Sequence, residues 1–529
     1  MVTRRQAMDV RHQLEQTPFG ASLRLPFSRS LMPWAGALAV LSASLFCASG
    51  NYRDAAIAAA TVLGAAFMVV ANVSVEAILV TWFITTPIAS FFIRVPLDRS
   101  IITYNRTVFG LLIIVLLLRR RSSMQDASKS SDSFDSPDVA TTSVKQGSGL
   151  RSFSITKFEA AWALLSLAAL VSVAVKSYDP AYAARVAIDA LWLPLVAFHI
   201  TRNHFDLRRC GRALVLGVIA LALFLTASGA IEFVTGSDLF RYKGSEILRE
   251  GERRINGPFI SDSSYSIICL MLFLFLLGAR RLTRIRFDRS ANLAYVLALA
   301  GAAAGVMLSL FRSVMAALVL CWIVLEFSGR LERRSPGLSG PSALLRRVAL
   351  GPLIAVIILA IIAGAASVAP SLVQSRLSDP RTAFGRLATW RAAATLTLSN
   401  PAFGVGLGNY PEYFRDKRWY RGDLIQDVFY ARAADSPHSN LLWIAAELGV
   451  IALGLYLAAN IYLFLMGWRT LRRSSESGKR IAASLFLALL FAYWIPGLAL
   501  ASGEYSELNL CFFFLLGALS SEFSRSQAS

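Results

Sequence analysis

The sequence predicts an all-α polytopic membrane protein with about 12–14 transmembrane helices. Only 16% of its 529 residues are charged, whereas a soluble protein carries about a quarter. Apolar runs of about 17–25 residues, the length that crosses about 30 Å of hydrocarbon, recur from one end of the sequence to the other. Soluble cores do not require such runs, so the chain is expected to fold in a lipid bilayer.

About fourteen apolar runs are candidate spans, and two of them are weak. The run 104–118 is short, and the run 183–199 contains Arg185 and Asp189. The first run begins at Leu31 and is followed by further spans, so it is interpreted as a retained helix and not as a cleaved signal peptide. The candidate spans are 31–49, 55–72, 75–93, 104–118, 157–176, 183–199, 211–234, 261–278, 291–309, 313–328, 348–369, 441–466, 481–499 and 506–522.

Polar segments divide these spans into groups. Residues 119–156 are rich in Ser, Asp and Lys and too poor in apolar residues to fold, so they are expected to form a disordered cytoplasmic linker. The other expected parts are a cytoplasmic N-terminal tail (1–30), N-terminal transmembrane helices (31–118), transmembrane helices with an outer loop at 235–260 (157–369), a large and mostly helical periplasmic loop (about 370–440) and C-terminal transmembrane helices (441–522).

Membrane topology explains the net charge of +20, which arises from 53 Lys and Arg against 33 Asp and Glu. Cytoplasmic loops concentrate Lys and Arg. If the N-terminus is cytoplasmic, every short basic loop falls on the same side, including the loops that contain Arg119–Arg121 and Arg472–Arg473. This agreement supports the orientation and argues against nucleic acid as a partner.

Arginines also occur in the segments assigned to the opposite face. Arg254 lies in the segment 235–260, and Arg386 lies in the long loop. Arg312 is the strongest case, because it lies in a hairpin with almost no loop (SLFRSVMAAL), which leaves the cation at the membrane interface. Guanidinium groups bind phosphate bidentately and stay charged, so these arginines predict a site for a lipid-linked phosphate or diphosphate. The alternative is that they pair with carboxylates such as Glu250 or bind lipid head groups.

His438 is the only histidine in the segments assigned to the outer face, and it lies where the long loop re-enters the membrane (Ser436-Pro437-His438-Ser439-Asn440). Histidine titrates near neutral pH and can take a proton from a sugar hydroxyl, so His438 is a candidate general base. A structural role is the alternative. Glu447 follows nine residues later, inside the expected span, and is expected to pair with an interior arginine.

No metal or cofactor is expected. The five cysteines are scattered and have no zinc-binding spacing. The phosphate-binding glycine motif of ATPases is absent, and the glycine-rich GLGNYP is interpreted as a turn.

Taken together, these segments resemble the O-antigen ligase/polymerase family of bacterial envelope proteins over about residues 210–470. The resemblance rests on ERRINGPFISDSSYSIICLML, the SLFRSVMAAL hairpin, GRLATWRAAATLTLSNPAFGVGLGNYPEYF and PHSNLLWIAAELGVIALGLYL. The most specific features are His438 followed by Glu447-Leu448-Gly449, Gly385-Arg386 with Trp390, Asn400-Pro401 followed by Gly404, Gly406 and Gly408, and Arg312 after Ser309. Two departures are His-Ser-Asn, where many members have His-Asn, and Phe311, where a Ser-Arg pair is common.

The resemblance implies metal-independent, inverting glycosyl transfer at the periplasmic face of the bacterial inner membrane, by a protein of GT-C-like glycosyltransferase architecture. The donor would be a glycan on undecaprenyl diphosphate. Arg312, Arg386 and Arg254 would bind the diphosphate, and His438 would activate the acceptor hydroxyl. Trp390, Asn440 and Glu447 would support these residues.

The acceptor differs between branches of the family: lipid A-core for a ligase, another lipid-linked repeat unit for a polymerase, and a protein in a smaller branch. The extended linker and the total length favour a polymerase of O-antigen or exopolysaccharide, with the ligase as the alternative. A transporter or flippase of lipid-linked oligosaccharides is the alternative of another class. It would place charges and broken helices around a cavity at mid-membrane, whereas the ionisable residues of this sequence cluster at the outer face.

Overall fold

The computed structural model describes residues 74–92, 94–95, 102–131, 155–236, 239–240, 255–259, 261–283, 285, 287–309, 311–333, 381–416 and 436–523. Three expected spans (31–49, 55–72 and 348–369) lie outside these residues, as does most of the expected outer loop 235–260. The chain divides into two compact units, residues 1–82 with 92–150 and residues 83–91 with 151–529.

The first unit contains the start of helix α4 (Val75–Phe92), β1 (Arg94–Val95), β2 (Ile102–Thr103) and α5 (Tyr104–Ser131). Residues 83–91 of α4 belong to the second unit. The two short strands pair antiparallel, with Arg94 opposite Thr103. The Trp82 indole donates a hydrogen bond of 3.0 Å to the Asn105 side chain, and its ring meets Phe109 edge to face. These contacts join the start of α5 to α4.

Helix α5 runs past residue 118, where the expected span ends, and continues to Ser131. Residues 119–131 were expected to belong to the disordered linker. They contain Arg, Met, Gln and Ala, which are good helix formers, and a helix that is already nucleated extends at little cost. The apolar content of this stretch was therefore a poor guide to where the helix ends.

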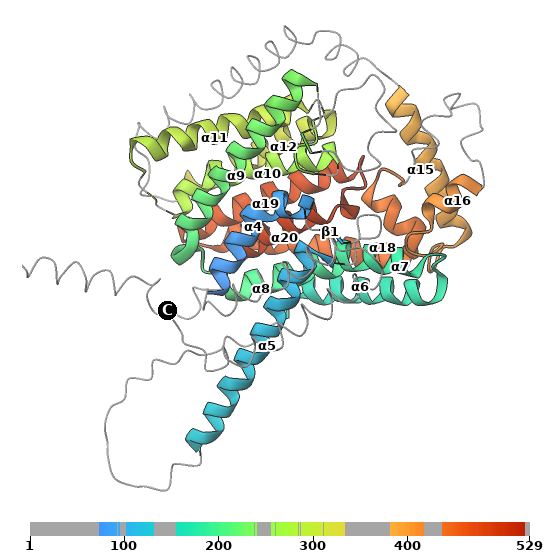
Figure 1. The fold of residues 1–529 in the computed structure, drawn as a ribbon, viewed down its shortest axis with the longest axis horizontal. Helices are drawn as coiled ribbons and strands as arrows, with labels where there is room; N and C mark the ends of the chain where they lie inside the picture. The colour runs from blue at the N-terminus through green and yellow to red at the C-terminus, as the bar shows by residue number, and fades with distance from the viewer. Residues whose placement is uncertain are drawn as a thin grey trace, which may run out of the picture. The chain divides into compact units, whose positions relative to one another are not determined.

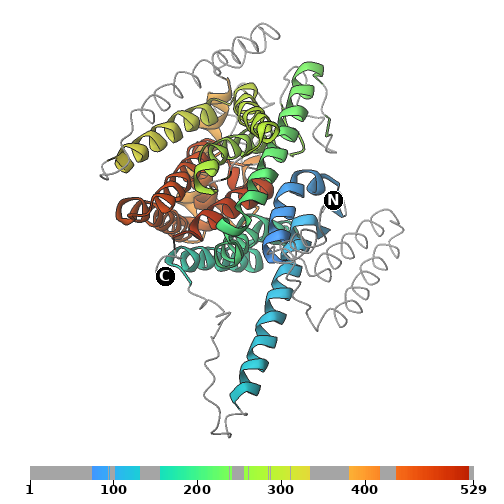
Figure 2. The same cartoon turned by 90° about the vertical axis from the view of Figure 1, so that its left-hand side faces the viewer.

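The second unit is a bundle of helices (Figure 1). Its C-terminal helices α19 and α20, drawn in red, lie between α10 and α12 on one side and α6 and α8 on the other, as Figure 1 and Figure 2 both show. The elements are α6 (Lys157–Lys176), α7 (Pro180–Ala187), a π-helical turn η1 (Ile188–Trp192), α8 (Leu193–His204), α9 (Leu207–Thr235), α10 (Asp262–Thr283), α11 (Arg289–Leu308), α12 (Arg312–Arg333), α15 (Arg381–Ser399), α16 (Tyr410–Asp416), α18 (Asn440–Arg473), α19 (Ser477–Gly497), a 3-10 turn η4 (Ser502–Glu504) and α20 (Ser506–Ser520).

Seven helices among the described residues are long and apolar enough to cross a membrane, and all coincide with expected spans. The prediction of a polytopic, all-α membrane protein is confirmed, with the two short strands of the first unit as the small departure. The weak span 183–199 lies within a continuous helix, Pro180–His204, whose π-helical turn carries Asp189. One extra residue in that turn shifts the helical register, which a hydrophobic pattern does not reveal.

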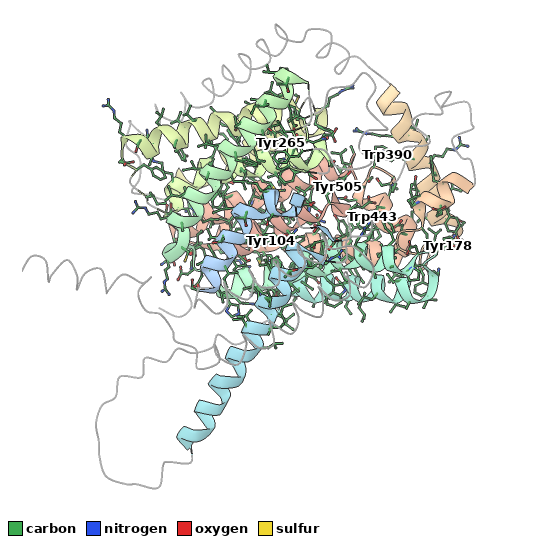
Figure 3. All side chains as sticks on the ribbon, in the orientation of Figure 1. Tyr104, Tyr178, Tyr265, Trp390, Trp443 and Tyr505 are labelled. Carbon is green, nitrogen blue, oxygen red and sulfur yellow. The ribbon has the colours of Figure 1, made fainter. Side chains whose placement is uncertain are left out.

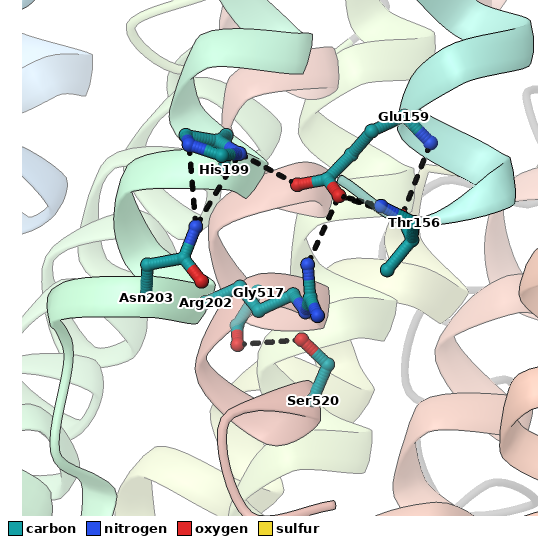
Figure 4. A network of polar contacts seen from close by, with 7 residues as sticks. All are labelled: Thr156, Glu159, His199, Arg202, Asn203, Gly517 and Ser520. Atoms are coloured by element: carbon teal, nitrogen blue, oxygen red, sulfur yellow. Dashed lines mark hydrogen bonds and ion pairs between the residues drawn. The ribbon is translucent and has the colours of Figure 1, made fainter. Parts of the chain in front are cut away.

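A buried carboxylate joins the start of α6 to the end of α8 (Figure 4). Glu159 is 4% exposed and accepts hydrogen bonds from the Thr156 amide at 2.6 Å and from Arg202 Nη1 at 2.9 Å. His199 Nδ1 lies 2.7 Å from its other oxygen. Thr156 and Glu159 also form a capping box, so the same residue begins the helix and pairs it to a neighbour.

Replacing Glu159 with Ala removes an ion-pair partner of Arg202 and the acceptor of the Thr156 amide. We expect the variant to lose about 3 kcal/mol of stability, because breaking a largely buried ion pair by removing one partner is costly. Glu476, half exposed and paired with Lys479 at 3.1 Å, is the matched control, and its replacement by Ala should change stability by less than about 1 kcal/mol. Thermal unfolding of the two variants in detergent compares them. Equal losses would contradict a central role for Glu159.

Candidate functional site

The candidate site lies where α18 begins. Ser439 is the N-cap of this helix, and His438, directly before it, has a left-handed backbone with φ 49°. His438 is the only residue other than glycine with positive φ among those that the structure describes. An L residue is held in this conformation only when its surroundings require it, and such residues cluster at functional sites.

Asn440 connects the start of α18 to the η4 turn. Its side-chain amide donates to Ser502 Oγ at 3.0 Å, and its carbonyl oxygen accepts from the Gly503 amide at 2.8 Å. Asn440 is 3% exposed, so both groups of its amide are used inside the protein. The structure therefore gives Asn440 a positioning role, between the helix start and the η4 turn.

Helix α15 lies against the same helix start and carries Arg386 and Trp390 (Figure 3). Thr389, between them, reaches the carbonyl of Pro437 at 3.4 Å, and the Tyr410 hydroxyl donates to the Thr389 carbonyl at 3.0 Å. Both Arg386 and Trp390 are half-buried. The indole N–H of Trp390 is buried without a hydrogen-bond partner among the described residues.

Glu447 is 2% exposed and accepts three hydrogen bonds. The Gly408 amide and the Trp443 indole donate to Oε2 at 2.9 and 2.8 Å, and the Tyr410 amide donates to Oε1 at 3.0 Å. In the described part of the chain its partners are thus N–H groups of a turn and an indole, and the prediction of an arginine partner is wrong. Three neutral donors already satisfy the carboxylate, so no cation is needed.

The segment before Gly408 and Tyr410, whose amides bind Glu447, forms backbone hydrogen bonds with a break in α18. Gly449 has φ 85° inside the helix, and the freed backbone groups pair with the segment after α15. The Val450 amide donates to the Pro401 carbonyl at 2.8 Å, while the amides of Val405 and Gly406 donate to Ala446 and Glu447, each at 2.9 Å. A Cβ on Gly404 or Gly449 would collide with the opposite backbone. This close approach explains why glycines recur here.

Asn409, which was not predicted as a site residue, completes the turn. It is 2% exposed, donates to the carbonyls of Lys176 and Val405 at 2.8 and 3.0 Å, and accepts from the Tyr178 amide at 3.1 Å. Its position inside the GLGNYP turn was the available signal, since asparagine side chains commonly bond to backbone in turns.

Arg312 is exposed and is the first residue of α12. Three positions earlier, Ser309 at the end of α11 forms a hydrogen bond with Ser266 in the first turns of α10, with 2.8 Å between the hydroxyl oxygens. The start of α10 is in turn close to η4, because the Tyr505 phenol hydrogen-bonds to Ser261 and Ser263, and burial raises the pKa of Tyr505 to about 12.

Polar contacts therefore connect the start of α12 to the start of α18. They run through α10 and η4, and η4 bonds to Asn440. Arg312 and His438 thus lie at the same end of the bundle. Arg254 lies outside the described residues, so its position was not tested.

Residues 296–457 match the family model described as O-antigen ligase. This part of the chain is similar to that family. The matched range includes Arg312, Arg386, His438 and Glu447 but not Arg254, and it confirms the resemblance to the O-antigen ligase/polymerase family. No protein of curated function matches the sequence. Among the residues that the structure describes, no three His, Cys, Asp or Glu side chains are grouped so that they could hold a metal ion.

Replacing Glu447 with Gln places an amide NH₂ where the carboxylate accepts N–H donors. At least one buried donor then loses its acceptor, at a cost of about 1–3 kcal/mol. We expect lower thermal stability, because the turn and the start of α18 are no longer held together. Glu476→Gln, at the exposed N-cap of α19, is the control and should behave as the wild type. Wild-type behaviour of Glu447→Gln would contradict the role assigned to this carboxylate.

Replacing Gly449 with Ala should impair folding of the same region. The backbone of Gly449 (φ 85°, ψ 177°) lies in a region that essentially only glycine adopts, which costs an alanine about 1–3 kcal/mol, and the collision of the new methyl group with the Ala402 carbonyl adds to this. Gly454, five residues further along α18, has open space around its Cβ position, and Gly454→Ala should be neutral or slightly stabilising. Thermal unfolding of both variants tests this close approach of the two backbones, and equal melting temperatures would argue against it.

Proposed function

We propose that this protein is a membrane glycosyltransferase that acts at the periplasmic face of the bacterial inner membrane. It transfers a glycan from undecaprenyl diphosphate to the next lipid-linked repeat unit and so polymerises a surface polysaccharide. The observation that carries the proposal is the left-handed His438 at the start of α18, inside the O-antigen ligase match and at the same end of the bundle as Arg312.

In this reaction His438 takes the proton from the acceptor hydroxyl as the new glycosidic bond forms. The bond between the donor sugar and the diphosphate breaks, and the lipid diphosphate leaves with the electron pair. Arg312 and Arg386, with Arg254 as a third candidate, stabilise the charge on the leaving group. This direct displacement needs no covalent enzyme intermediate, and we propose that it needs no metal.

The ligase reaction, with lipid A-core as acceptor, is the second candidate because the matching family model is described as O-antigen ligase. Both reactions use the same donor and the same leaving group. Surface glycans of a deletion strain separate them. Single repeat units on lipid A-core indicate a lost polymerase, whereas long chains left on undecaprenyl diphosphate indicate a lost ligase.

The placement of buried charges favours transfer over transport. Glu159, Glu232, Asp262 and Glu522 lie within or just beyond the first or last turns of their helices. Glu447 lies deeper, and its three donors are accounted for within the protein. A transporter would be expected to present such groups around a mid-membrane cavity.

Replacing His438 or Arg312 with Ala should reduce transfer by about 10²–10⁴-fold, because each removes a group that acts in the transition state. Two controls are matched by type and setting: His204→Ala at the end of α8, and Arg289→Ala at the exposed first residue of α11. Lipid-linked repeat units followed in cells should accumulate on the outer leaflet in the two site variants only. Accumulation confined to the inner leaflet would contradict the proposal and support transport.

A further inference from the structure

Four aromatic side chains form an exposed patch beside the turn that Glu447 holds. We call Tyr178, Tyr182, Phe403 and Tyr413 the aromatic patch. Tyr178 is 66% exposed, Phe403 65% and Tyr182 41%, and Tyr413 is half-buried. Large aromatic rings that are exposed together, and not singly, mark a surface that binds something.

The rings of Tyr178 and Tyr413 lie side by side, although 235 positions separate them in the sequence. Their centroids are 5.8 Å apart, and the Tyr178 hydroxyl donates to the Tyr413 hydroxyl at 3.2 Å. Each tyrosine fixes the orientation of the other, so the two rings form one apolar surface that carries two hydroxyl groups. Tyr178 lies between α6 and α7, and Tyr413 lies on the short helix α16.

The backbone beneath the patch is rigidly held. Lys176 Nζ donates to the Gly404 carbonyl at 2.8 Å, the Leu407 amide donates to Ser172 Oγ at 3.0 Å, and Asn409 bonds to both Lys176 and Tyr178. A Cβ on Gly408 would press on the Tyr182 ring. The patch is therefore preorganised, which reduces the entropy lost when a ligand binds.

Among the side chains that the structure describes, two basic and two acidic residues lie around the patch. Lys176 and Arg185 are basic and lie 5.9 and 5.1 Å from the ring centroids of Phe403 and Tyr182, while Asp179 and Glu412 are acidic and exposed. An arginine-rich surface selects anions, but a balanced rim around aromatic rings suits a ligand with apolar faces and many hydroxyl groups. Sugars have this character, because their C–H faces stack on rings and their hydroxyls bond to the rim.

We propose that the aromatic patch binds the oligosaccharide portion of the lipid-linked glycan, several sugars away from the bond that reacts. The patch and the start of α18 share one scaffold, since the same turn bonds to Tyr178 through Asn409 and to Glu447 of α18. The inference rests on the proposed function for the identity of the glycan. Its consequence is that the protein prefers glycans of several repeat units to single ones.

A membrane-interface anchor is the competing explanation, because Tyr and Trp are enriched at head-group level. The tyrosine pair favours the glycan. The two rings lie side by side as one surface, and Tyr413 belongs to a helix outside the candidate spans. The two explanations differ in what leucine at these positions changes: the anchor predicts lower stability in a bilayer, whereas the glycan site predicts weaker oligosaccharide binding.

The experiment measures binding of repeat-unit oligosaccharides to the full-length protein in lipid nanodiscs. The probes are single and four-repeat oligosaccharides, released from the carrier lipid of the native strain, and saturation-transfer NMR reports binding. We expect the double variant Tyr178→Leu with Tyr413→Leu to bind the longer probe about tenfold more weakly. Tyr178→Phe with Tyr413→Phe keeps the rings and should bind nearly as the wild type. Tyr462→Leu, at an exposed tyrosine on α18, is the control and should be silent.

Unchanged binding by the leucine double variant would overturn the inference, as would equal weakening by the Tyr462 control. Loss of thermal stability in nanodiscs with unchanged oligosaccharide binding would support the membrane anchor instead and overturn it too. The proposed function is tested separately. If the wild type binds the longer probe through these tyrosines but transfers no glycan, the inference about the aromatic patch stands and the proposed transferase activity is contradicted.

Discussion

The carboxylate of Glu447 is the constraint on which the end of the bundle with His438 depends. An ionised carboxylate away from water costs several kcal/mol unless donors surround it. Two of the donors come from a turn of the chain about forty positions earlier, so this turn must lie against α18 whenever the protein is folded. The third donor, Trp443, is on α18 itself, one turn nearer to His438.

The break in α18 adds a second requirement at the same place. A helix that is interrupted inside a membrane leaves backbone groups without partners, and lipid cannot supply them. Here Pro401, Val405 and Gly406 supply those partners. The glycines permit the approach of the two backbones, and Glu447 and Asn409 keep it in register. One rigid unit thus supports the start of α18, α16 and the aromatic patch.

Much of the fold could be predicted from composition, because crossing a bilayer demands long apolar runs. The span 157–176 coincides with α6, and each of the other candidate spans within the described residues corresponds to a helix, although α5 continues past 118 to Ser131. The extension of α5 and the π-helical turn could not be predicted, because neither depends on hydrophobicity.

The sequence indicates candidate site residues, whose roles stay predictions, but it does not reveal their contacts. Arg312 and His438 stand out in the sequence because each is unusual at a membrane interface. Apart from the Trp443 indole, the partners of Glu447 and Asn440 do not stand out, since they are backbone groups and a serine brought together over about forty to sixty positions. Asn409 resembles any turn asparagine until Lys176 and Tyr178 are placed beside it.

The proposed reaction requires that the end of the bundle with His438 face the periplasm. The most direct test is to determine from which side of the membrane that end can be labelled. Glu412→Cys places a thiol on exposed α16 near the site, and Gly478→Cys places one at the opposite end, where the Cβ position is open. In a background without the native cysteines, a membrane-impermeant maleimide added to intact spheroplasts should label residue 412 and leave residue 478 unlabelled until the membrane is opened. Labelling of 478 alone would place the site in the cytoplasm and contradict the account.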